Sequence, residues 1–539
     1  MPRPILHTGR RRSTPRLGPP LGPMRVMGAV AVSLVMSCGA DAGSGDAADT
    51  GGGTAASTTD HSPSTTIGQT TPDPTDSSSG DLADTSGDDP TGAPSCDDLP
   101  TAITADGMRV HLEALEAIAV ANGNTRSVGT PGYDLSVEYV RAELEAVGYV
   151  VDLQQFDVNV FSIDGPASLA WQGQADYQQG TEFQIATYSA GGAPTAIARA
   201  VDLALGLGNA SSSGCEASDF DGFVAGSIAL VQRGACLTAQ KVLNAQQAGA
   251  VGVILFNQGD DEGRTGLWTT TLGAQSAIAI PVLLTPYWIG ESMAQAAPGT
   301  VSAAMDVDVT LEMRPTINLV VETPGGDPDE VVMLGAHLDS VPAGPGINDN
   351  GTGSAALLEV ARALAGCETT RKVRFGWWAA EEVGLVGSTI YVESLDAMQR
   401  ASILTYMNFD MIGSPNYVRF RYDGDGSGFG TTGPMGSAEL EQVFADYFDG
   451  LGLVSEEVPF DGRSDYGAFI ANGIAAGGLF TGAEGIKSDG QADVHGGAAG
   501  IAYDACYHAE CDGADNVDYT ILEGMGGAIA HAVALYAMP

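Results

Sequence analysis

Three short apolar runs of this 539-residue chain each precede residues that can bind a metal ion. The runs Val331–Leu334, Val373–Trp378 and Ile403–Met407 are rich in β-branched and aromatic residues, which predicts strands. The polar residues that follow them are, in order, His337 and Asp339, Glu381 and Glu382, and Asp410. In an open parallel α/β sheet, ligands bind where the carboxyl ends of the strands meet. The pattern therefore predicts a metal site at that edge.

Two further residues extend this set. Asp349 lies in a glycine-rich loop before a predicted helix, where a helix-capping aspartate is the alternative interpretation. His508 lies between Cys506 and Cys511, and a disulfide between these two would hold Tyr507 and His508 in place. Other histidines have simpler interpretations: His111 and His531 fall in helical segments, and His495 is a minor rival to His508 as a ligand.

The donor set indicates which metal would bind. Two imidazoles with three or four carboxylates suit a pair of zinc ions about 3.5–4 Å apart, whereas an all-oxygen set would favour magnesium or calcium. Adjacent carboxylates such as Glu381 and Glu382 repel each other unless a cation compensates. Zinc lowers the pKa of a bound water from ~15.7 towards ~7, and a free glutamate beside it can act as general base. This chemistry is hydrolysis.

Six short motifs carry a resemblance to a known family. They are His337–Ser340, Asp349–Gly353, Ala380–Gly384, Asn408–Gly413, Gly462–Tyr466 and Cys506–His508. In order and spacing they are similar to family twenty-eight of the metallopeptidases, above all to its secreted bacterial two-zinc aminopeptidases. The resemblance covers residues 97–539 apart from one insert.

The resemblance implies a role for each site residue. The implied zinc ligands are Asp349 as the bridge, His337 and Asp410 on one ion, and Glu382 and His508 on the other. By the same resemblance Glu381 is the general base and Asp339 orients His337. Tyr507 would polarise the scissile carbonyl, and Arg463 would lie near the substrate. The implied activity is removal of N-terminal amino acids from peptides; the alternatives are a carboxypeptidase or dipeptidase, or a non-catalytic binding protein.

The segment between the helical N-terminal region and the motifs has another character. Residues 159–312 contain many short strands, and Cys215–Gly259, with its turn Arg233–Cys236, resembles the protease-associated (PA) domain. Strand–helix alternation on both sides of this segment predicts one catalytic domain formed by 97–158 and 313–539. The expected fold is α/β, a mixed, mostly parallel sheet flanked by helices (the zinc exopeptidase fold), with a mainly-β PA insert.

The N-terminal region predicts export. A basic stretch precedes the apolar run Val26–Met36, and Ser37 and Cys38 follow it, which predicts a signal peptide with a bacterial lipobox over residues 1–38. The alternative is an ordinary cleaved signal in which Cys38 is incidental. Residues 39–95, rich in Gly, Ser, Thr and Asp, predict a disordered acidic linker. We therefore expect a cell-envelope lipoprotein or a secreted protein, attached to membranes only through that lipid.

Charge and cysteines complete the picture. A net charge of −44 argues against nucleic-acid binding. The family resemblance implies peptides with a free N-terminus as the partners. The remaining six cysteines are an even number in an exported chain, so disulfides are expected. Cys215 with Cys236 and Cys506 with Cys511 are the favoured local pairs, which leaves Cys96 and Cys367.

Overall fold

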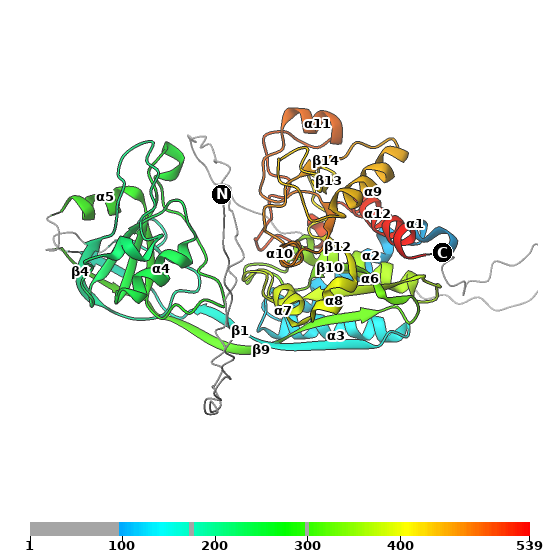
Figure 1. Cartoon of the computed structure of the whole chain (residues 1–539), viewed down its shortest axis with the longest axis horizontal. Coiled ribbons are helices and arrows are strands. Elements are labelled where there is room, and N and C mark those ends of the chain that lie inside the picture. Colours follow the sequence, from blue (N-terminus) through cyan, green and yellow to red (C-terminus); the bar gives the residue numbers. More distant parts are fainter. Residues whose placement is uncertain (1–95, 172–176, 297–300, 539) are drawn as a thin grey trace, which may run out of the picture. The chain divides into compact units, whose positions relative to one another are not determined.

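The computed structural model describes residues 96–171, 177–296 and 301–538. Its helices and strands are drawn in Figure 1. The predicted signal peptide (1–38) and acidic linker (39–95) lie outside the described residues.

An eight-stranded mixed sheet holds the three predicted strands at its centre. Its strands are β1 (Val151–Ile163), β9 (Val309–Glu322), β10 (Asp327–His337), β11 (Arg371–Trp378), β12 (Ile403–Phe409), β13 (Phe420–Tyr422), β14 (Glu456–Val458) and β15 (Ala476–Phe480). The spatial order is β1-β9-β11-β10-β12-β15-β13-β14. The central strands β11, β10, β12 and β15 run parallel, so their carboxyl ends share one edge.

Helices cover both faces of this sheet. They are α1 (Leu99–Ala102), α2 (Ala105–Ala121), α3 (Pro131–Ala146), α6 (Thr352–Leu364), α7 (Val386–Ser394), α8 (Ala397–Ser402), α9 (Ser437–Gly450), α10 (Tyr466–Ala471), α11 (Asp489–His495) and α12 (Tyr519–Ala537). Alternate residues of β10 point to opposite faces of the sheet. Val332 and Leu334 belong to the apolar cluster that includes residues of α6 and α12. Val331 and Met333 belong to the cluster on the other face, with Tyr391 of α7 and Phe469 of α10. Burial on both faces explains why the strands read as continuous apolar runs.

The last helix is almost entirely apolar on its inner side. By length and composition α12 is able to span a membrane, but 61% of its most apolar window is buried inside the protein. It contacts α6 and β11, as a core helix of an α/β sheet does.

A seven-stranded second sheet forms the inserted region. Its strands are β2 (Ser168–Trp171), β3 (Gln184–Ile185), β4 (Thr195–Ala200), β5 (Ile228–Gln232), β6 (Gly252–Phe256), β7 (Val282–Thr285) and β8 (Ser302–Asp306), accompanied by helices α4 (Thr238–Gln247) and α5 (Tyr287–Gln295). The order is β2-β8-β4-β5-β6-β7-β3, with β4 to β7 parallel. The expected mainly-β character is confirmed.

Two long strands join the inserted region to the first sheet in the chain. β1 and β9 pair antiparallel without interruption from Val151 with Val321 to Ile163 with Val309. The predicted domain boundaries, after residues 158 and 312, fall inside these two strands, and they remain a prediction.

Three disulfides occur within the described ranges. Cys215–Cys236 and Cys506–Cys511 are the two local pairs expected from the sequence, and Cys96–Cys367 joins the two cysteines that were left.

Candidate metal centre

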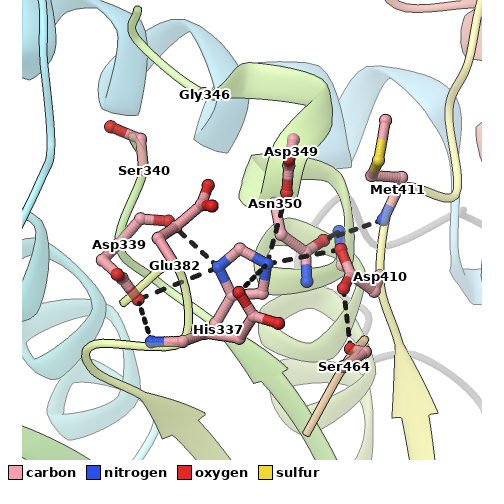
Figure 2. A network of polar contacts seen from close by, with 12 residues as sticks. His337, Asp339, Ser340, Gly346, Asp349, Asn350, Glu382, Asp410, Met411 and Ser464 are labelled. Atoms are coloured by element: carbon pink, nitrogen blue, oxygen red, sulfur yellow. Dashed lines mark hydrogen bonds and ion pairs between the residues drawn. The ribbon is translucent and has the colours of Figure 1, made fainter. Parts of the chain in front are cut away.

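His337 lies at the carboxyl end of the central strand β10 and is 1% exposed. Its Nδ1 lies 3.1 Å from the backbone carbonyl oxygen of Asp339 and 3.8 Å from that residue's carboxylate. A hydrogen bond at Nδ1 fixes the ring orientation of a metal-binding histidine. Its other nitrogen, Nε2, faces two carboxylates, since it lies 3.3 Å from Asp349 and 3.3 Å from Asp410 (Figure 2).

Asp349 lies between two histidines. Its Oδ1 is 3.3 Å from His337 Nε2, and its Oδ2 is 3.2 Å from His508 Nε2. It lies in the segment Ile347–Gly351 that leads into α6, its own backbone is not helical (φ −108°, ψ 92°), and the N-terminal cap of α6 is Gly351. Asp349 is therefore not the capping residue of that helix. A carboxylate with one oxygen towards each imidazole has the geometry of a bridging ligand.

The two glutamates after β11 have different neighbours. Glu382 Oε2 lies 3.0 Å from His508 Nε2, whereas Glu381 Oε2 lies 4.0 Å from His337 Nε2. The backbone N–H of Glu381 donates to Asp339 Oδ1 at 3.1 Å, which ties this turn to the residue after β10. Glu382 is thus paired with a histidine, and Glu381 lies further back in the same site.

Asp410 closes the site from the third strand, directly after β12. Its Oδ1 faces His337, while its Oδ2 accepts a hydrogen bond of 2.7 Å from the Ser464 hydroxyl (Figure 2). One oxygen is thereby held in place and the other is directed at the histidine.

These residues fit a site for divalent zinc. The candidate ligand atoms of His337, Asp349 and Glu382 all lie within 4.8 Å of one another, as do those of His337, Glu381 and Asp410. Over the part of the chain that the structure describes, the buried Glu382 Oε1 has no hydrogen-bond partner, so it is available to a cation. Imidazole nitrogens and carboxylate oxygens are donors that zinc takes.

The electrostatics of the site favour a bound cation. Burial and the Asp349 carboxylate raise the pKa of Glu382 to about 7. Burial lowers the pKa of His508, but its hydrogen bonds to Asp349 and Glu382 outweigh that effect and raise it to about 10. Burial also raises the pKa of Glu381 well above its usual range. A divalent cation among these carboxylates would restore their charged forms.

A cavity opens beside the cluster. Asp349, Glu381 and His508 lie at its charged end, and Met411, Val458 and Phe480 contribute apolar wall. A substrate entering this cavity would bring one end to the carboxylates and imidazoles and the adjoining side chain to the apolar wall.

Tyr507 and Arg463 line the same cavity and contact each other. Arg463 Nη2 donates to the Tyr507 hydroxyl oxygen at 3.1 Å, and the arginine also forms a two-pronged ion pair with Glu484. The Tyr507 ring stacks on His508, with ring centroids 3.8 Å apart. Burial raises the pKa of Tyr507 far above its usual value, so its hydroxyl keeps its proton at neutral pH.

Three supporting residues escaped the sequence analysis. Arg126, fully buried, donates from its guanidinium to the carbonyl oxygens of Leu338, Pro345 and Gly346. Asp512 accepts from the backbone N–H groups of Asn348 (2.8 Å) and Asp349 (3.1 Å). The Asn350 side chain spans the carbonyl of Phe409 and the N–H of Met411. No local signal marks Arg126 or Asp512, because each acts on a loop more than a hundred residues away in sequence.

The three remaining histidines within the described residues have partners outside the site. His111 lies between Tyr139 and Glu359, His495 lies 3.1 Å from Glu456, and His531 packs on the ring of Tyr447.

Comparisons with known proteins show the family of the chain. Residues 318–533 match Peptidase family M28, and residues 200–293 match the PA domain. An aminopeptidase of Pseudomonas aeruginosa strain PAO1 is 48% identical over 434 residues, which are 80% of this chain and 81% of that protein. The chain belongs to Peptidase family M28. Leucine aminopeptidase 2 of Trichophyton tonsurans is 40% identical to this M28 chain, over 82% of it and 86% of the relative.

Solved structures share the M28 fold. An aminopeptidase from Aneurinibacillus sp. strain AM-1 has a TM-score of 0.66 at 24% identity, covering 83% of this chain and 97% of that one. A zinc aminopeptidase from Bacillus subtilis has a TM-score of 0.56 at 24% identity, covering 81% and 96%.

Proposed function

We propose that this M28 chain is a two-zinc aminopeptidase that removes N-terminal amino acids from peptides. The observation that carries the proposal is the position of Asp349, with one oxygen 3.3 Å from His337 and the other 3.2 Å from His508. Relatives named as aminopeptidases, at 48% and 40% identity, support the same activity. A solved structure of the same fold, from Bacillus subtilis, is named as a zinc aminopeptidase.

The ligand assignment follows from which side chains lie together. His337 and Asp410 would hold one ion, Glu382 and His508 the other, and Asp349 both. Zinc bound there would polarise the scissile carbonyl and activate the attacking water.

The remaining residues would carry out the proton transfers and hold the substrate. Glu381 accepts the proton of the attacking water and passes it to the leaving amine. The protonated Tyr507 hydroxyl, held by Arg463, donates to the oxygen of the scissile carbonyl. The free N-terminus would be held by the carboxylates at the charged end of the cavity, with its side chain against the apolar wall.

The test uses aminoacyl-nitroanilides and peptides with free or acetylated N-termini, assayed with and without a chelator. We expect about two zinc ions per chain by metal analysis. We also expect cleavage only of free-amine substrates, and loss of activity on chelation that zinc restores. Cleavage of blocked peptides from the C-terminus would favour a carboxypeptidase, and a zinc-free, inactive protein would favour a binding protein.

Disulfides support action outside the cytoplasm, because they persist in oxidising compartments. We place the enzyme in the cell envelope, attached by a lipid on Cys38, a residue outside those the structure describes. Replacing Cys38 by Ser should abolish incorporation of labelled fatty acid and release the protein from membranes. Unchanged membrane association of that variant would contradict the lipid anchor.

A further inference from the structure

A second group of carboxylates lies outside the proposed zinc site, two in the loop between β13 and α9 and one in α9 itself. Candidate ligand atoms of Asp423, Asp425 and Glu441 all lie within 4.8 Å of one another. Because calcium–oxygen distances are about 2.3–2.6 Å, three oxygens so placed can touch one ion. All three donors are hard oxygens, with no imidazole or thiolate among them.

One buried oxygen of this group has no partner. Asp423 is 1% exposed, and its Oδ2 accepts from the backbone N–H groups of Gly428 (3.2 Å) and Phe429 (2.8 Å). Its Oδ1 is buried and accepts no hydrogen bond from any residue that the structure describes. Burying a carboxylate oxygen without a hydrogen-bond donor lowers the stability of the folded protein. A bound cation would compensate its negative charge.

The nearby positive side chain, Arg421, forms ion pairs with two glutamates. Arg421 lies 3.3 Å from Glu441 Oε1 and 2.8 Å from Glu457 Oε1, so it is shared by two glutamates. The other oxygen of Glu441 accepts from the backbone N–H groups of Gly424 (2.9 Å) and Asp425 (3.2 Å). One arginine against four carboxylates leaves the loop with a net charge of about −3 at neutral pH.

The sequence of the loop supports an oxygen-ligand ion. Asp423, Asp425 and Ser427 alternate along the chain and Gly428 follows, which is the spacing of the first, third, fifth and sixth positions of calcium loops. A Cβ atom at residue 424 would lie 2.1 Å from the carbonyl oxygen of Ser437, so only glycine lets the loop pass the start of α9. The loop is thereby brought to Glu441, one turn further along that helix.

We propose that Asp423, Asp425 and Glu441 form a binding site for a calcium-type divalent cation, separate from the zinc centre. The ion would neutralise the loop and bind the free Asp423 oxygen. Tyr422, the residue before Asp423, lines the substrate cavity, and the Asp423 N–H donates to the carbonyl of Val458 in the same wall at 2.9 Å. The ion therefore stabilises a segment that supports the cavity.

The test is calorimetric titration of the zinc-loaded full chain, in chelator-treated buffer, with calcium chloride. Asp425→Asn is the test variant, because Asp425 is exposed and its replacement leaves the buried contacts of the loop intact. Asp449→Asn, an exposed position near the end of α9, is the matched control. Thermal unfolding of the three proteins, with and without calcium, is the second measurement.

We expect one calcium ion per wild-type chain with a dissociation constant of about 1 mM or tighter, and binding at least about tenfold weaker in Asp425→Asn. Calcium should raise the midpoint of thermal unfolding of the wild type and Asp449→Asn but not of Asp425→Asn. The proposal fails if the wild type shows no saturable calcium binding, if Asp425→Asn binds as well as the wild type, or if only zinc binds at this loop.

Discussion

At the scale of single residues, the two adjacent glutamates after β11 differ in what surrounds them. Glu382 is 3.0 Å from a histidine nitrogen and has a free buried oxygen, as a metal ligand requires. Glu381 is 4.0 Å from His337, and its backbone is held by Asp339. Residue type and position after the strand do not distinguish them, and in the sequence only the family resemblance gave them different roles. These different surroundings support the proposal that Glu382 is the metal ligand and Glu381 the general base.

The first prediction concerns that division. Glu381→Gln removes the group that accepts the proton and keeps the shape of the side chain, so kcat should fall by about 10²–10⁴-fold. Zinc content should stay as in the wild type, because in the proposed assignment Glu382, and not Glu381, is the zinc ligand. Steady-state kinetics and metal analysis measure the two quantities. Glu393→Gln, at an exposed position of α7, is the control and should keep full activity. A Glu381→Gln enzyme with wild-type activity would contradict the proposal that Glu381 is the general base.

At the scale of elements, the loop closed by Cys506–Cys511 holds Tyr507 and His508 towards the other ligands. His508 adopts a left-handed backbone conformation (φ 56°), which is unfavourable for a residue with a side chain. Replacing both cysteines by alanine should free this conformation, so kcat/KM for a small aminoacyl substrate should fall at least about tenfold, because metal ligands lose affinity when their support is lost.

The disulfide Cys215–Cys236 in the PA region supplies the matched control. Its removal should lower the unfolding free energy by about 3 kcal/mol, as expected for a loop of this length, with little effect on kcat/KM. Kinetics and denaturant unfolding of both double variants make the comparison. Equal losses of activity in the two variants would show that the 506–511 loop has no special positioning role.

Arg126 gives a prediction about the loop that carries the bridging aspartate. Lysine at this position keeps the charge but reaches fewer of the three carbonyl oxygens that the guanidinium serves. Two buried carbonyls without donors should lower the unfolding free energy by about 2–4 kcal/mol. Chemical denaturation measures this loss. Arg141→Lys, on the exposed side of α3, should change it by less than about 0.5 kcal/mol.

A buried lysine makes the stability of the PA region depend on pH. Lys241 is 1% exposed, and burial lowers its pKa to about 8. The unfolded chain binds this proton up to about pH 10.4, so between the two values unfolding takes up a proton and stability rises with pH. The Lys241→Met variant has no such group, so this increase of stability with pH should be absent from it.

The stability difference between the Lys241→Met variant and the wild type measures the effect. It should shift in favour of the wild type by about 3 kcal/mol between pH 8 and pH 10.5. Thermal or urea unfolding across that range checks the shift. If the stability difference does not change with pH, burial does not lower the pKa of Lys241 in the folded protein.

The strands and most of the site were predictable because both depend on local chemistry. A strand buried on both faces has a continuous apolar sequence, and the proposed ligands His337, Glu382 and Asp410 lie where such runs end. Contacts such as those of Arg126 and Asp512 depend on which distant loops meet. The strand order and the antiparallel pairing of β1 with β9 likewise follow from tertiary packing and not from a local pattern.

At the scale of the whole molecule, the peptidase sheet is assembled from both sides of the insertion. β1 comes from before the second sheet in sequence, and β9 to β15 come from after it. Helices α2 and α3, which precede the insertion, pack on α6, which follows it. The N-terminal segment 105–163 therefore cannot be removed without exposing the core around α6.

The disulfide between Cys96 and Cys367 spans 271 residues and encloses the whole inserted region. A protease that cuts the chain once anywhere between these two cysteines produces two polypeptides that stay covalently joined. Such a nicked enzyme should migrate as one species in a non-reducing gel and separate into two bands on reduction. The bond therefore keeps a once-cut chain in one piece wherever another protease acts on it.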